Sequence, residues 1–240
     1  MLYFVAFLIT VLGGLIQTVT GFGSGIVMML IFPYVFGIIK APALTTSISL
    51  GLNIALTWKF RKYIDPKVVL SPTIAFFATS FTIIHFVEKI KADYLYVLFG
   101  SFLIILALYF FIFAKKASVR PGIAAGIICG AVSGVCSGMF GIGGPMLAPY
   151  FVAATDSKES YLGNMQGLFA VTSLINTISR MHLGIYTFDL LPVTAIGIVG
   201  ILIGKTAGLK ILYKINAEKL PKIIYGFVAV SGAVILIQHL

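Results

Sequence analysis

Two apolar stretches of the chain are each interrupted by a short run rich in glycine. The first run is Thr20–Gly25, which reads TGFGSG, and the second is Phe140–Pro145, which reads FGIGGP. Glycine adopts backbone conformations that end a helix, and a helix that restarts afterwards presents free N–H groups and the positive end of its dipole. Such a helix start binds an anion without any charged side chain. The two runs therefore predict an anion site made of backbone and neutral side chains.

Neutral polar side chains near the two runs complete the candidate site. Gln17 and Ser137 precede the runs by about one helical turn, and Asn53 and Asn176 lie at matching positions in the two halves. The residues expected to contact the substrate are Gln17, Gly21, Phe22, Gly23, Ser24, Asn53, Ser137, Gly141, Ile142, Gly143, Gly144 and Asn176. This composition predicts binding by hydrogen bonds rather than by ion pairing.

Both features also have a purely structural interpretation, which the sequence leaves open. Small residues allow membrane helices to approach closely, and buried asparagines often bond neighbouring helices to one another. A further series of glycines has that packing role in our interpretation: Gly197, Gly200, Gly204 and Gly208. For the two interrupted stretches we favour a site, because a break inside a bilayer survives only where it is packed in protein or lines a polar cavity.

The ionisable residues indicate neither an enzyme nor a metal or cofactor site. All seven Asp and Glu residues fall at segment ends or in connections, and the three His residues are unrelated in spacing. The sequence contains no recognisable nucleophile–base pair and no phosphate-binding loop. Arg180 is expected near the outer end of its segment, so that no lysine or arginine lies at the depth of the glycine runs.

The composition indicates a membrane protein. Hydrophobic residues make up 60% of the chain and charged residues 10%, with a mean hydropathy of +1.09; a soluble domain carries about 25% charged residues. The net charge of +10 would suggest nucleic acid in a soluble protein, but the basic residues lie in short clusters between apolar runs. That is the pattern of cytoplasmic loops. We therefore expect lipid and a small anion as partners, and no nucleic acid.

Ten apolar runs are candidates for membrane segments, since a helix needs about 20 apolar residues to cross the bilayer core. They are residues 2–19, 23–39, 43–58, 67–87, 93–114, 122–139, 143–154, 160–179, 188–212 and 219–238. The second and seventh runs are short and directly follow the glycine runs. Whether these two cross the membrane completely stays open.

The two halves of the chain resemble each other weakly but in order. Gly21 and Gly23 match Gly141 and Gly143 at a shift of 120 residues. Each half holds five apolar runs, and an odd number places the halves in opposite orientations. We therefore predict an all-α polytopic membrane protein made of two inverted repeats, with the glycine-broken helices near the midplane. The predicted parts are a first repeat at 1–114, a basic cytoplasmic linker at 115–121 and a second repeat at 122–240.

The distribution of basic residues orients the predicted segments. Connections after the odd-numbered runs carry twelve lysines and arginines, whereas those on the other side carry four. Because cytoplasmic loops are enriched in lysine and arginine, the twelve are placed inside. Both chain termini are then predicted outside.

Several motifs resemble the sulfite-exporter-type (TauE/SafE) permeases along almost the whole chain. They are the first glycine run followed by Pro33, the stretch Ala43–Ser47, the basic loop Lys59–Lys62, the second glycine run, the turn Gly184–Asp189 and the later glycine series. The resemblance implies transport of small sulfur-containing or organic anions, such as sulfite, thiosulfate or sulfonates. It also implies a prokaryotic plasma membrane.

The sequence is therefore interpreted as a permease for a small anion bound between two repeats. Two alternatives stay open: an uncoupled, channel-like facilitator, and a non-transporting scaffold or assembly protein whose glycine runs only pack. The sequence does not decide the anion, the direction, the coupling ion or the oligomeric state, a homodimer included.

Overall fold

The computed structural model describes residues 2–113, 120–212 and 237. The predicted linker at 115–121 therefore lies largely outside the described residues, and the tenth apolar run, 219–238, does so apart from residue 237. The described part is built of helices and short connections, without a β-strand. The prediction of an all-α protein is confirmed for these residues.

The helices follow the predicted runs closely. Their bounds are α1 (Leu2–Thr20), α2 (Ser24–Met29), α3 (Phe32–Phe36), α4 (Lys40–Phe60), α5 (Pro66–Val87), α6 (Ala92–Phe113), α7 (Ile123–Phe140), α8 (Gly144–Ala154), α9 (Lys158–His182) and α10 (Leu191–Ile211). Short 3₁₀ turns, η1 (Arg61–Tyr63) and η2 (Phe188–Leu190), precede α5 and α10. Five helices of the described part are long and apolar enough to cross a membrane: α1, α5, α6, α7 and α10.

The run predicted at 23–39 is two short helices, α2 and α3, rather than one segment. Pro33 lies in the first turn of α3; its nitrogen has no hydrogen to donate, and its ring would clash with the carbonyl of Met29 in a continuous helix. The break between α2 and α3 follows from that clash. Helix α8 has 11 residues, which is about 16 Å at 1.5 Å per residue. Neither α2 nor α8 is long enough as a helix to cross a core of about 30 Å.

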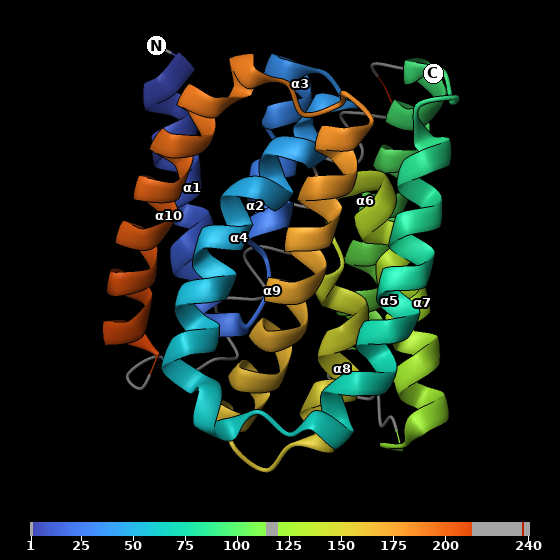
Figure 1. Ribbon diagram of the computed structural model, residues 1–240. Helices are drawn as coiled ribbons and strands as arrows, with labels where there is room; N and C mark the ends of the chain where they lie inside the picture. The colour runs from blue at the N-terminus through green and yellow to red at the C-terminus, as the bar shows by residue number, and fades with distance from the viewer. Residues whose placement is uncertain (1, 114–119, 213–236, 238–240) are drawn as a thin grey trace.

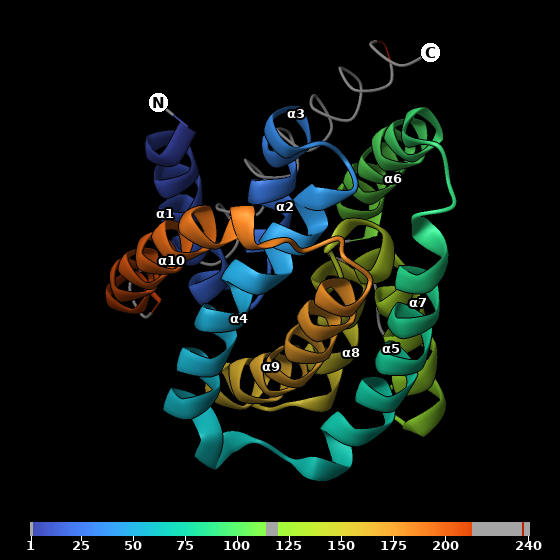
Figure 2. The same cartoon turned by 45° about the horizontal axis from the view of Figure 1, so that its top comes forward.

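Helices α4 and α9 lie side by side in the middle of the molecule, with α1 and α10 on one flank and α5 and α7 on the other (Figures 1 and 2). The central pair is antiparallel, because Asn53 of α4 contacts Ser173 of α9 while Thr46 contacts Arg180. These two helices carry polar residues that face each other and are buried. Their polarity explains why α4 and α9 are not among the five helices that are long and apolar enough to cross a membrane.

Close glycine contacts join the helices of each flank. Added Cβ atoms at Gly200 and Gly204 of α10 would meet Thr10 and Val11 of α1, so the predicted packing role of this glycine series is confirmed. A second series of glycines on α7 does the same against α5: Gly126, Gly130, Gly134 and Gly138. In both flanking pairs, later glycines of one helix contact later residues of the other helix, so the two helices of each pair run parallel.

Candidate functional site

The two glycine runs, far apart in the sequence, meet inside the bundle. A Cβ atom on Gly25 would lie 2.8 Å from the carbonyl oxygen of Gly141. One on Gly144 would lie 2.3 Å from the Cβ atom of Phe22. Both separations are far below van der Waals contact, so only glycine permits this approach. The two breaks are thus in direct contact.

The backbone at three of the break positions also requires glycine. Helix α1 ends at Thr20, where Gly21 and Gly23 have φ angles of 86° and 114°. Helix α7 ends at Phe140, where Gly141 has a φ angle of 69°. Side chains disfavour this left-handed region. Gly143 has an ordinary φ of −115° and is required instead by space, since a Cβ there would lie 2.7 Å from the Phe76 ring.

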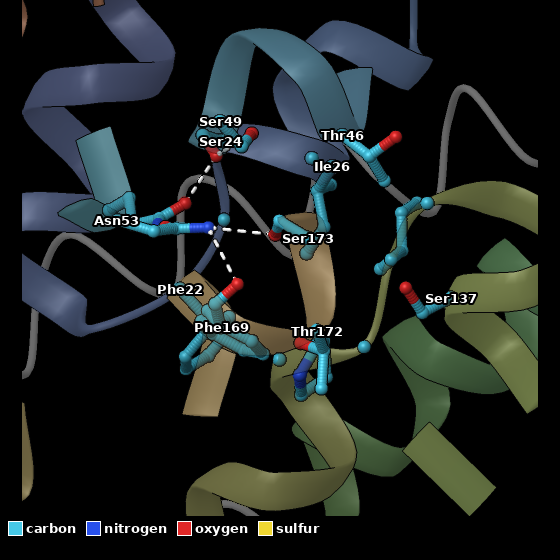
Figure 3. Close-up of a pocket in the computed structure, with 18 of the residues that line it drawn as sticks. Phe22, Ser24, Ile26, Thr46, Ser49, Asn53, Ser137, Phe169, Thr172 and Ser173 are labelled. Atoms are coloured by element: carbon cyan, nitrogen blue, oxygen red, sulfur yellow. Dashed lines mark hydrogen bonds between the residues drawn. The ribbon is translucent and has the colours of Figure 1, made fainter. Parts of the chain in front are cut away.

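A small cavity lies where the two breaks meet (Figure 3). The space that the centres of water-sized molecules can occupy is about 40 Å³. Ten of the twelve residues predicted for the site line it: Gln17, Phe22, Gly23, Ser24, Asn53, Ser137, Gly141, Ile142, Gly143 and Gly144. Gly21 and Asn176 are not part of the lining. No lysine, arginine or carboxylate side chain of the described residues lines the cavity.

On the side of the first break, the polar side chains form one buried hydrogen-bond network. The amide nitrogen of Gln17 donates to Asn53 Oδ1 at 2.7 Å and to Gln166 Oε1 at 3.0 Å. The hydroxyl of Ser24 donates to the Gln17 oxygen. Asn53 in turn donates to Ser173 Oγ at 2.9 Å, a bond that Figure 3 shows. The network joins α1, α2, α4 and α9 around the cavity.

On the side of the second break, Asn176 lies behind the cavity wall. Its oxygen accepts from the hydroxyl of Ser80 at 3.0 Å, and its nitrogen lies 3.4 Å from Ser137 Oγ as a donor. Ser137 itself lines the cavity. The two asparagines therefore differ in position: Asn53 reaches the cavity directly, and Asn176 reaches it only through Ser137.

The model of the sulfite exporter TauE/SafE family matches residues 6–235 of this chain. The chain belongs to this family. It is also 26% identical to a "Probable membrane transporter protein" of Methanocaldococcus jannaschii, over 99% of this chain and 95% of that protein. No solved structure matches the chain. The resemblance in the sequence motifs is thus confirmed, and this TauE/SafE-family chain is a multi-pass membrane transporter.

Helix α9 of this TauE/SafE-family chain contacts both breaks, which the sequence prediction missed. Near its start, Gln166 donates to the carbonyl of Gly21 at 2.7 Å, and the Tyr161 hydroxyl donates to that of Thr20 at 2.9 Å. Of this helix, the sequence prediction included only Asn176 in the site. Gln166, Phe169, Ser173, Asn176 and Arg180 follow helical spacing on one face, and that spacing was the available signal.

The predicted position of Arg180 was wrong. Its side chain is 1% exposed and lies level with the second break, not at the outer surface. Two of its N–H donors reach the carbonyl oxygens of Gly138 and Ser137, at 2.8 and 3.2 Å. The prediction failed because the position of a residue along a helix does not show which face the neighbouring helices cover. The Arg180 face points to α4 and α7.

Proposed function

We propose that the cavity between the two breaks is the substrate site, and that the protein transports a small sulfur-containing or organic anion through it. The observation that carries this proposal is the contact of two glycine breaks, one from each half of the chain, around a cavity lined by neutral polar groups. Broken helices meeting in this way are the usual construction of a transporter's central site. The family's description as a sulfite exporter supports the substrate class.

The size of the cavity favours a compact anion. A single water molecule needs about 10–15 Å³ of the same measure, so a cavity of about 40 Å³ has room for roughly three water-sized positions. This suits an oxyanion of the size of sulfite. A sulfonate with a longer carbon chain requires the cavity to widen.

Hydrogen bonds and helix starts hold the anion in this proposal. Ser137 Oγ accepts from Asn176, so its own hydrogen is available to an anion in the cavity. Gln17, Ser24 and Asn53 donate within the buried network and exchange these partners for the anion when it binds. Helix α8 adds its N-terminal N–H groups except at Pro145, and α2, with six residues, adds less. A helix end contributes about 0.3–2 kcal/mol and a hydrogen bond about 0.5–1.5 kcal/mol. The sum of two helix ends and a few hydrogen bonds corresponds to a dissociation constant of roughly micromolar to millimolar. An anion held this weakly is released again.

We also propose that residues 1–114 and 122–240 are inverted repeats joined by 115–121. The helix pairing supports this, because α1 packs along α10 while α7, its counterpart in the second half, packs along α5. The central helices α4 and α9 pair with each other in antiparallel orientation. A two-fold axis in the membrane plane produces such an exchange of partners.

Transport is tested with purified protein in proteoliposomes, by the uptake of sulfite and of thiosulfate. We expect saturable uptake, and an increase in thermal stability with the same anions, because a ligand that binds the folded state stabilises it. Proton movement that accompanies uptake identifies a coupled carrier, and its absence identifies a facilitator. If no small anion is taken up and none stabilises the protein, the scaffold alternative holds and the proposal is overturned.

The predicted orientation is tested by cysteine labelling in a variant without Cys129 and Cys136. Lys62 and Lys91 flank α5, whose 22 residues span about 33 Å, so they lie at opposite ends of a crossing helix. Lys91→Cys is expected to react with a membrane-impermeant thiol reagent in intact cells. Lys62→Cys is expected to react only after the cells are permeabilised. The reverse pattern contradicts the placement of both termini outside.

The two asparagines are expected to differ in their effect on transport. The repeat alone predicted similar effects, but Asn53 lines the cavity and Asn176 does not. Asn53→Ala removes a polar side chain of the cavity lining and breaks the Gln17 network, so we expect the apparent KM to rise about tenfold, the equivalent of roughly 1.4 kcal/mol. Asn176→Ala is expected to change KM less than threefold. Equal changes in KM, measured at matched expression, contradict this assignment.

A further inference from the structure

Arg180 carries a positive charge in the interior without a negative partner. Among the lysines and arginines that the structure describes, it is the one with a buried side chain. Its four hydrogen bonds go to uncharged oxygens, namely the carbonyls of Pro42, Ser137 and Gly138 and the hydroxyl of Thr46. None of the described Asp and Glu residues is buried. In the described chain the ion pair observed is Lys40–Asp189, with both side chains exposed.

The charge lies directly behind the cavity wall. Two of the four partners, Thr46 and Ser137, line the cavity, and in Figure 3 they lie on the same side of it. Nη1 of Arg180 lies 3.2 Å from Thr46 Oγ1, and Nη2 lies 3.2 Å from the Ser137 carbonyl oxygen. Charges interact far more strongly in a protein interior than in water. A solute in the cavity is therefore exposed to this charge across a single layer of side chains.

Capping the broken helix does not account for the charge. At the first break, the neutral side chains of Gln166 and Tyr161 satisfy the carbonyls of Gly21 and Thr20. At the second break, Arg180 donates to the carbonyls of Ser137 and Gly138 in the last turn of α7, one turn before the carbonyls that match those of Thr20 and Gly21. Burying a charge costs far more than burying an amide or a hydroxyl. The same fold thus uses a neutral cap at one break and a charged cap at the other.

We propose that Arg180 sets the charge selectivity of the cavity: its unpaired charge favours anions over neutral solutes, and divalent anions over monovalent ones. This inference rests on the proposed function, since it assigns a selectivity residue to the same site. A bound anion supplies the counter-charge that the protein lacks. Arg180 acts through the cavity wall, as a positioning and electrostatic residue, because its side chain is not part of the cavity lining.

The test compares two probes with similar sulfur–oxygen heads, sulfate with two charges and methanesulfonate with one. Dissociation constants are measured by thermal stabilisation of purified protein. Arg180→Gln keeps hydrogen-bond donors and removes the charge. If that change weakens the binding of methanesulfonate about tenfold, the doubled charge of sulfate predicts that sulfate binding weakens about 100-fold. Arg180→Lys keeps the charge and is expected to keep the preference for sulfate.

Two controls separate charge from structure. Lys205→Gln removes the same formal charge from a position on α10 outside the cavity lining and is expected to leave both constants unchanged. Thr46→Asp keeps Arg180 and supplies a carboxylate beside it, so the sulfate preference is expected to disappear. Thr46→Asn, of the same shape but neutral, is expected to keep it. If Arg180→Gln does not fold, the wild-type protein decides the matter, because equal dissociation constants for sulfate and methanesulfonate overturn the inference.

The outcomes distinguish the two proposals. Equal losses for both anions in Arg180→Gln, or equal effects of Thr46→Asp and Thr46→Asn, show that Arg180 only packs the broken helix and overturn the inference alone. Wild-type protein that binds no anion overturns the proposed function and this inference together.

Discussion

Gly204→Ala is expected to separate α10 from α1 and to destabilise the whole bundle. The added Cβ atom would lie 2.0 Å from the carbonyl oxygen of Val11, and a backbone atom cannot turn away as the end of a side chain can. Overpacking typically costs about 1–3 kcal/mol and occasionally more, and this contact belongs at the upper end. For a chain of this size, 3 kcal/mol corresponds to a fall of roughly 6–12 °C in apparent Tm.

The measurement is thermal unfolding of purified protein in detergent, with Gly122→Ala as the matched control. An added Cβ atom at Gly122 would meet nothing within 4 Å, and its φ angle of 173° is extended backbone. The control is expected to unfold at the wild-type temperature. Equal unfolding temperatures for Gly204→Ala and Gly122→Ala would mean that close α1–α10 contact does not hold the bundle together.

Gly144→Ala is expected to abolish most transport, because it forces the two breaks apart at the cavity. Its added Cβ atom would lie 2.3 Å from the Cβ atom of Phe22, which is fixed to the opposite break. Gly25→Ala acts from the other side, against the Gly141 carbonyl at 2.8 Å. A displacement of about 1 Å at a positioned site reduces rates on the order of 100-fold, and we expect a loss of that scale in initial flux.

The control for this second experiment is Gly167→Ala on α9. Its added Cβ atom would meet only the side chain of Ile64, at 3.3 Å, and that side chain has freedom to move. All three variants are assayed in proteoliposomes at equal protein content, after size-exclusion chromatography confirms folding. Wild-type flux in both Gly144→Ala and Gly25→Ala would show that the breaks serve packing alone.

In the proposed site, Arg180 and the neutral lining have two separable roles. We propose that the donors from Gln17, Asn53 and the helix starts determine how tightly an oxyanion is held, and that Arg180 determines which charge is preferred. The expected effects of Asn53→Ala and Arg180→Gln follow from this division. The first raises the KM for every substrate, and the second changes the ratio between substrates of different charge.

The sequence by itself determined the features that depend on local chemistry. Apolar runs bounded by charge and proline predicted the helices within a few residues, because a membrane helix must satisfy its own backbone. Glycine runs predicted the two breaks, because glycine adopts the left-handed conformation found at Gly21, Gly23 and Gly141 without the steric cost that a side chain adds. The glycine series of α10 predicted close packing for the same local reason, the absence of a Cβ atom.

Tertiary structure alone decided which side chains reach the cavity. Asn53 and Asn176 occupy matching places in the sequence, yet only Asn53 lines the cavity, because Ser137 stands between it and Asn176. Arg180 lies in the last turn of a polar helix and was expected near the outer end of its segment, yet it is buried against Ser137 and Gly138. Periodicity shows which residues share one face of a helix, but it does not show what covers that face. The residues that cover Arg180 come from a segment more than 40 residues away in the sequence. Contacts over that distance are set by the packing of the whole bundle.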